Sequence, residues 1–136
     1  TALTFFASGV NFHSNTPNSK GATRDQIAKF GNNYLLSGDP TAANYYKFDF
    51  YHVPTDFDYV GLKSDLGHGW SVDDKAYTYR YYNAQNYNDP TKITATSGVD
   101  KLNSYRRIGN IVPVTQVSSH GTLKTGLWSE YSWSDG

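Results

Sequence analysis

Apolar and polar residues alternate one by one along several stretches of this chain, most clearly over residues 122–134. Leu123 and Leu127 fall at odd positions there, and Lys124 and Glu130 fall at even positions. Successive side chains of a β-strand point to opposite faces of the sheet, so the pattern predicts a strand whose faces meet different surroundings. The apolar face would form the core of a water-soluble sandwich or contact lipid in a transmembrane β-barrel.

Weaker alternation, interrupted by turn-forming residues, continues along most of the chain. It predicts strands at residues 1–12, 45–52, 57–66, 70–82, 105–117 and 122–134. Gly67-His68-Gly69 predicts a tight turn between two of these strands. Thr23 is a good N-cap residue, so residues 23–30 are expected to form one or two helical turns.

Three tyrosines break the regular pattern of the strand predicted at residues 70–82. Tyr77, Tyr79 and Tyr81 stand at the opposite parity to Trp70. One inserted residue reverses the parity of a strand, so we predict a bulge near residues 73–74. The three tyrosines would then form a girdle at a lipid interface.

The predicted connections alternate in length along the chain. Residues 13–44 and 83–103 form long polar stretches, whereas 67–69 and 118–121 are short turns. Long loops at one end and short turns at the other are typical of bacterial outer-membrane barrels. The predicted fold is therefore all-β, with antiparallel up-and-down strands that form part of a transmembrane β-barrel wall carrying two long loops.

Composition narrows the function classes. The 136 residues carry a formal net charge of zero and no cysteine, so we expect no nucleic-acid partner, no disulfide framework and no thiolate metal site. The four histidines are scattered, and neither a metal nor a cofactor is expected. Aromatic residues make up 16% of the chain, as suits lipid-interface girdles or a sugar-stacking surface. The lack of any methionine, including at position 1, predicts an excerpt of a longer chain, so residues 1–136 would be a fragment of the outer-membrane barrel domain that the loop pattern predicts.

Three runs of sequence carry a family resemblance. They are DDKAYTYRYYNAQNY at residues 73–87, VDKLNSYRR at 99–107 and HGTLKTGLWSEYSW at 120–133. These runs resemble barrel strands and extracellular loops of TonB-dependent outer-membrane receptors, including a G-x-W-x-E-[YW] run that begins at Gly126. No plug or TonB box is present. The resemblance implies import of a siderophore, cobalamin or oligosaccharide across the outer membrane of a Gram-negative bacterium. It also implies three partners: the rest of the barrel and plug, the TonB complex through that plug, and outer-membrane lipid.

Catalytic motifs are mostly missing, and we expect no enzyme activity from a barrel wall. The best carboxylate pair is Asp56 and Asp58, which point the same way on a strand about 7 Å apart at Cα. That separation is near the one that glycosidases use, although Asp-x-Asp at a strand start is usually turn chemistry. Glu130 could join this pair from another strand. The competing interpretation of Glu130 is an ion pair with Lys124 or with an arginine on a neighbouring strand.

The expected ligand-binding residues combine aromatic, amide and cationic side chains. They are Arg80, Tyr82, Asn86, Tyr87 and Trp128. Arg80 would bind an anionic ligand or stack on Tyr82, and the amides with Tyr87 would contact sugar hydroxyls and ring faces or belong to a solvated loop. Two alternatives to the receptor remain: a soluble β-rich glycan-binding module or glycoside hydrolase, and an interaction protein that pairs through exposed sheet edges.

Overall fold

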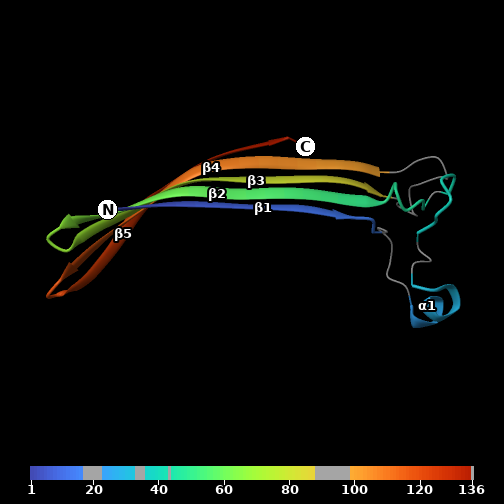
Figure 1. The fold of residues 1–136 in the computed structure, drawn as a ribbon, viewed down its shortest axis with the longest axis horizontal. Helices are drawn as coiled ribbons and strands as arrows, with labels where there is room; N and C mark the ends of the chain where they lie inside the picture. The colour runs from blue at the N-terminus through green and yellow to red at the C-terminus, as the bar shows by residue number, and fades with distance from the viewer. Residues whose placement is uncertain (17–22, 33–35, 43, 88–98, 136) are drawn as a thin grey trace. The chain divides into compact units, whose positions relative to one another are not determined.

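The computed structural model describes residues 1–16, 23–32, 36–42, 44–87 and 99–135. Five strands and one helix lie in these ranges: β1 (Ala2–Ser14), α1 (Arg24–Phe30), β2 (Phe50–Gly67), β3 (Trp70–Tyr87), β4 (Val99–Ser118) and β5 (Gly121–Asp135). The strands form one sheet in the order β1-β2-β3-β4-β5 (Figure 1). This arrangement confirms the predicted all-β class with antiparallel, up-and-down strands.

The chain divides into two compact units. The first, called the sheet unit here, comprises Thr1–Val10, Thr55–Tyr81 and Ser104–Gly136. The second, called the loop unit, comprises Asn11–Pro54 and Tyr82–Asn103. The residues of β1 to β4 are shared between the two units, and β5 belongs entirely to the sheet unit.

Within the sheet unit, the register of β4 and β5 defines two faces. Leu127 pairs with Val112 and Tyr131 pairs with Ile108, and we call the side of the sheet that carries these residues the leucine face. Glu130 pairs with Gly109 and Trp128 pairs with Ile111, and we call the side that carries these residues the tryptophan face. The alternation predicted for residues 122–134 is therefore confirmed.

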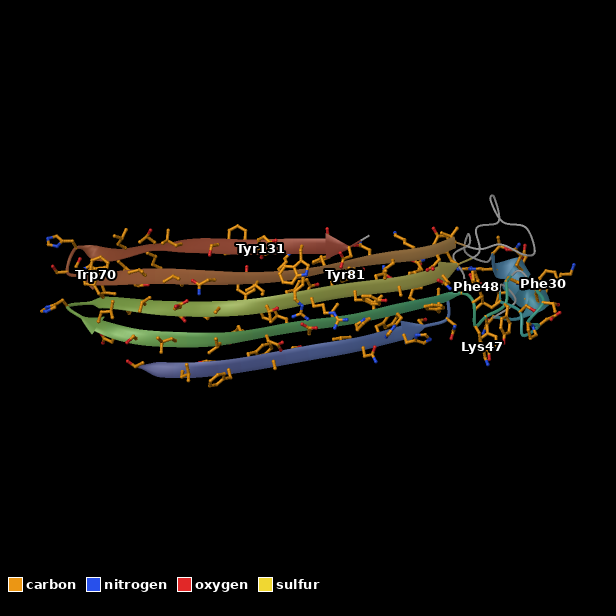
Figure 2. The ribbon with its side chains drawn as sticks, turned by 90° about the horizontal axis from the view of Figure 1, so that it is seen from above. Phe30, Lys47, Phe48, Trp70, Tyr81 and Tyr131 are labelled. Atoms are coloured by element: carbon orange, nitrogen blue, oxygen red, sulfur yellow. The ribbon has the colours of Figure 1, made fainter. Side chains whose placement is uncertain are left out.

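Neither face of the sheet unit is covered. Among the described residues, no hydrophobic side chain is buried. Leu127 on the leucine face is 78% exposed, and Trp128 on the tryptophan face is 67% exposed. Figure 2 shows Trp70 and Tyr131, which are also exposed, standing at the surface of the layer. A sheet gains stability chiefly by packing an apolar face, so this layer lacks the usual core of a soluble sandwich.

The helix follows its local sequence signals. The Thr23 hydroxyl accepts from the backbone N–H of Gln26, and the Gln26 side chain accepts from the backbone N–H of Thr23. This reciprocal capping box satisfies two N–H groups at the start of α1 and confirms the predicted N-cap. No helix in the described ranges has the length and hydropathy that a membrane crossing requires.

Several strands are longer than expected. β2 begins at Phe50 and continues through Pro54, so the predicted strand at residues 45–52 and its interruption are largely wrong. β3 extends to Tyr87, which places Asn86 and Tyr87 on a strand instead of at the opening of a loop. β-propensity depends on the neighbours of a strand. Because the residues at these strand ends are mostly polar, their sequence alone did not indicate that they pair in the sheet. Residues 88–98 of the second predicted loop lie outside the described residues.

The predicted bulge in β3 is wrong. The backbone N–H of Val117 donates to the carbonyl of Gly69, and Tyr77 lies over Gly109. Gly69 and Tyr77 are eight residues apart on β3, and their partners Val117 and Gly109 are eight residues apart on β4. No residue is therefore inserted in β3 between these two contacts. Without a bulge, the three tyrosines lie on the opposite face of the sheet from the one that the bulge would have given them. Tyr77, like Tyr79 and Tyr81, lies on the tryptophan face.

Candidate functional site

A group of four side chains, joined by two hydrogen bonds and one ion pair, forms the centre of the tryptophan face. The indole Nε1 of Trp128 donates to the hydroxyl of Tyr77 at 2.9 Å. That hydroxyl donates to Oε2 of Glu130 at 2.7 Å. The second carboxylate oxygen, Oε1, lies 3.4 Å from Nη1 of Arg107. The group links β3, β4 and β5, and it confirms the ion pair between Glu130 and an arginine of a neighbouring strand.

Gly109 leaves the space that the ring of Tyr77 needs to reach β5. Tyr77 starts on β3 and reaches residues of β5, so its ring must cross β4. A Cβ atom built at Gly109 would lie 2.7 Å from Cε1 of Tyr77 and closer still to Cζ and the hydroxyl. Real Cβ atoms do not come that close, so a side chain at residue 109 would displace the ring. Glycine inside a strand often marks such a close approach.

Further aromatic rings extend from Tyr77 towards β1. The ring of Phe57 lies 6.3 Å from that of Tyr77, and Phe6 lies 6.1 Å from Phe57. Tyr59 is stacked on Phe6 at 5.3 Å with an interplanar angle of 15°. We call the set Phe6, Phe57, Tyr59, Tyr77 and Trp128 the aromatic row. Cross-strand aromatic pairs of this kind also stabilise a sheet.

A second aromatic group adjoins Arg107. Tyr81 is stacked on Tyr105 at 5.2 Å, and Tyr79 lies 5.8 Å from the same ring. The guanidinium of Arg107 lies over Tyr105, 5.1 Å from the ring centroid. Arg107 therefore contacts an aromatic face as well as the Glu130 carboxylate, and two contacts fix its position.

The leucine face carries its own charged group. Oδ2 of Asp56 lies 3.7 Å from Arg106 and 4.0 Å from Arg80, and Arg106 also donates to the hydroxyl of Thr78 at 3.1 Å. The other oxygen of Asp56, Oδ1, is buried with no hydrogen-bond partner among the described residues. The contacts with two arginines make Asp56 part of a structural ion-pair group on this face.

The structure does not bring Glu130 to the aspartate pair. Asp56 contacts Arg106, whereas Glu130 contacts Arg107. Arg106 and Arg107 are consecutive residues of β4 and point to opposite faces. Asp58 follows Asp56 at the same parity of β2, so it shares the face of Asp56. The three carboxylates therefore do not share one face of the sheet, so Asp56, Asp58 and Glu130 do not form a catalytic group.

Three of the expected ligand-binding residues belong to the loop unit. Tyr82 lies 6.4 Å from the ring of His52. With its amide oriented to satisfy its hydrogen bonds, Asn86 donates to the Asp100 carboxylate at 2.9 Å and to the carbonyl of Gln85 at 3.2 Å. Tyr87 ends β3 and is half-buried. The other two, Arg80 and Trp128, belong to the sheet unit and lie on opposite faces of it.

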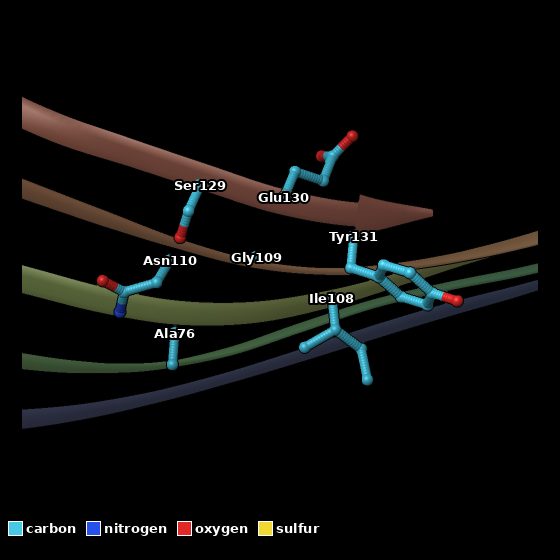
Figure 3. A pocket seen from close by; sticks show the side chains of 7 residues that line it. All are labelled: Ala76, Ile108, Gly109, Asn110, Ser129, Glu130 and Tyr131. Atoms are coloured by element: carbon cyan, nitrogen blue, oxygen red, sulfur yellow. The ribbon is translucent and has the colours of Figure 1, made fainter. Parts of the chain in front are cut away.

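A shallow hollow of about 410 Å³ lies on the leucine face. Its lining residues are Ala76, Ile108, Gly109, Asn110, Ser129, Glu130 and Tyr131. Figure 3 shows the side chains of Ile108 and Tyr131 on one side of the strands and that of Glu130 pointing away from them. The Glu130 carboxylate is therefore not available to this hollow, whose other lining residues carry no charged side chain.

Sequence reasoning identified Trp128 and Glu130 but missed Tyr77 and Gly109 as members of the site. The glycine inside a predicted strand was the available signal. In the part of the chain that the structure describes, no three histidine, aspartate or glutamate side chains gather as metal ligands do. Comparisons with protein-family models, with curated proteins and with solved structures find no match for this chain.

Proposed function

We propose that this chain forms part of the wall of an outer-membrane β-barrel of the TonB-dependent receptor type. The leucine face contacts lipid, and the tryptophan face lines the path of the imported ligand. The observation that carries the proposal is the difference between these two faces of β5, which are both exposed but differ in charge.

The leucine face matches a bilayer in length and chemistry. From Leu123 to Trp133, this face of β5 carries no charged side chain. Ten residues of strand span about 34 Å, or about 26 Å in height at a tilt near 40°, close to the roughly 25 Å apolar band of such barrels. On this face, Arg106 is the partner of Trp133 at the end of the stretch, and Asp74 of β3 accepts a 2.6 Å hydrogen bond from Asn110, the partner of Ser129, within it. Arginine and tryptophan together are typical of a membrane interface.

The tryptophan face suits an aqueous lumen. Lys124, Glu130 and Arg107 all lie on it, and Trp128 contributes an aromatic surface among them. Polar side chains line the interior of large transport barrels, and substitutions there alter selectivity. A siderophore, cobalamin or oligosaccharide would contact this face on its way through the outer membrane.

The two edges of the sheet support the proposal that further barrel strands are partners of this chain. β1 and β5 are the outermost strands of the described sheet. Their unpaired backbone groups would each cost several kcal/mol in hydrocarbon, so a membrane location requires neighbouring strands that close the barrel. In an intact receptor of this type, a plug inside the barrel would couple it to the TonB complex.

The chain has no cysteine, which makes a labelling test direct. Single cysteines at Leu123, Leu127 and Tyr131 would carry a fluorophore in vesicles with brominated acyl chains, and Lys124, Trp128 and Ser132 supply the matched set. We expect quenching at the first three positions only. Equal quenching in both sets, or a chain that stays soluble and monomeric without detergent, would contradict the proposal and favour the soluble glycan-binding alternative.

A further inference from the structure

The aromatic row crosses the sheet unit from one edge strand to the other. Phe6 lies on β1, Phe57 and Tyr59 on β2, Tyr77 on β3, and Trp128 on β5. Neighbouring members are joined by ring contacts or by the hydrogen bond from Trp128 to Tyr77. The row therefore places aromatic groups at successive steps across the strands on a single face.

The row is continuous because β4 contributes no side chain to it. Gly109 occupies the place where β4 crosses the row, and the ring of Tyr77 fills that place from β3. A larger residue would separate Tyr77 from Trp128 and Glu130. Cross-strand pairing alone accounts for contacts between neighbouring strands. It does not account for a tyrosine that passes over a third strand to reach β5.

The row presents ring faces with little unbalanced charge. The indole N–H of Trp128 already donates to Tyr77, so Trp128, which is 67% exposed, offers a ligand its ring face. Two cations beside the row are paired, Arg107 with Glu130 at 3.4 Å and Lys75 with Asp73 at 2.7 Å. An anionic iron chelate would have to compete with these carboxylates. A neutral ring with an apolar face and polar edges meets no such competition.

We propose that the aromatic row is a binding track for a neutral oligosaccharide. Four inter-strand steps of about 4.8 Å give a track of roughly 19 Å, long enough for several sugar rings. Ring faces of the ligand stack on the aromatic side chains, and its hydroxyls face the polar groups of Glu130 and Arg107. This inference rests on the proposed function in one respect, namely that the tryptophan face lines the ligand path.

Calorimetric titration of the full chain in detergent tests the track. The probes are maltose and cellobiose oligomers of two to six glucose units, with ferric citrate as the anionic comparison. We expect affinity to rise with the number of rings and then level off, and ferric citrate not to bind. Trp128→Ala should weaken hexasaccharide binding about threefold to tenfold, and Trp128→Phe should weaken it less because a ring remains. Affinity that does not depend on length, or no binding in either series, overturns the proposal.

Two glycines provide a matched pair of variants. Gly109→Ala keeps every ring but moves Tyr77, whereas a Cβ at Gly61, on the same face, meets its nearest neighbours at an ordinary 3.6 Å. We expect Gly109→Ala to weaken hexasaccharide binding by a similar factor to Trp128→Ala, and Gly61→Ala to leave it unchanged. Equal effects of the two glycine variants would overturn the track. Lipid quenching without sugar binding would reject only the track, and sugar binding without lipid quenching would reject only the barrel.

Discussion

Trp128 donates a 2.9 Å hydrogen bond to the hydroxyl of Tyr77, although their strands, β5 and β3, are not neighbours in the sheet. Side chains on neighbouring strands meet routinely, whereas a contact across an intervening strand needs a small residue beneath it. Gly109 is that residue. The same hydroxyl also donates to Glu130, so the position of Tyr77 determines the arrangement of the candidate site.

The first prediction concerns the energetic coupling of these two residues. Trp128→Phe and Tyr77→Phe each remove the hydrogen bond, so in a double-mutant cycle we expect a coupling free energy of about 0.5 kcal/mol, the low end for hydrogen bonds because the groups are exposed. Urea unfolding in detergent gives the measurement. Trp133→Phe is the control, since Trp133 lies on the leucine face and should combine additively with Tyr77→Phe. A coupling of zero for Trp128 would show that the bond does not stabilise the sheet.

The second prediction concerns the stability effect of Gly109→Ala. Overpacking a close contact costs about 1–3 kcal/mol, and the Cβ would collide with the ring of Tyr77. In a Tyr77→Ala background the collision is gone, so the same substitution should be neutral or slightly stabilising. Unfolding free energies of the wild type, the two single variants and the double variant check this. A cost that persists without the Tyr77 ring would place its origin in the backbone.

Strict alternation made the faces of β5 predictable from sequence. Leu127 is at an odd position and Glu130 at an even one, so they were predicted to lie on opposite faces. The pairing with β4 confirms this prediction. The ion pair of Glu130 was predictable in kind because a carboxylate beside an arginine-bearing strand usually finds a partner. The strand ends were less predictable, since residues 83–87 are mostly polar and their pairing depends on neighbours in the sheet.

The contact between Tyr77 and Trp128 was not predictable from local patterns. The two residues are 51 positions apart, and no period in the sequence connects them. The parity of Tyr77 led to the wrong prediction of a bulge, because that prediction assumed that aromatic and aliphatic residues share one face. Here Tyr77, Tyr79 and Tyr81 lie on the same face as Glu130 of β5, whereas Leu127 lies on the other face.

The third prediction concerns Asp39, in the loop unit. The backbone N–H and the hydroxyl of Thr41 both donate to its carboxylate, which lowers the pKa of Asp39 below its ordinary 3.8. A lowered folded-state pKa stabilises the turn above the unfolded value, and this stabilisation is lost as pH falls through the folded pKa. Thr41→Val should raise the pKa of Asp39 only part of the way, because the backbone N–H is the larger cause. Carboxyl chemical shifts against pH measure it, and an unchanged pKa would contradict the hydroxyl's role.

The fourth prediction concerns the ion pairs of Asp56. Asp56→Asn leaves Arg80 and Arg106 without this carboxylate, and both guanidiniums are more than a third exposed. We therefore expect a loss of less than about 1 kcal/mol at low salt that shrinks as salt is added. Asp58→Asn, two residues along β2, is the matched control. Urea midpoints at two salt concentrations give the answer, and a loss independent of salt would contradict an electrostatic origin.

The fifth prediction separates a lipid-facing leucine face from a water-facing one. Leu127 is 78% exposed, so in water Leu127→Arg should change the unfolding free energy by less than about 0.5 kcal/mol. Against hydrocarbon, an arginine near the bilayer midplane costs about 2–4 kcal/mol. The variant should therefore fold poorly into vesicles, whereas Thr122→Arg, on the tryptophan face opposite the neutral Val117, should fold like the wild type. The folded fraction is read from tryptophan emission in vesicles, with both variants at equal lipid. Equal folding of the two arginine variants would mean that the leucine face does not contact acyl chains.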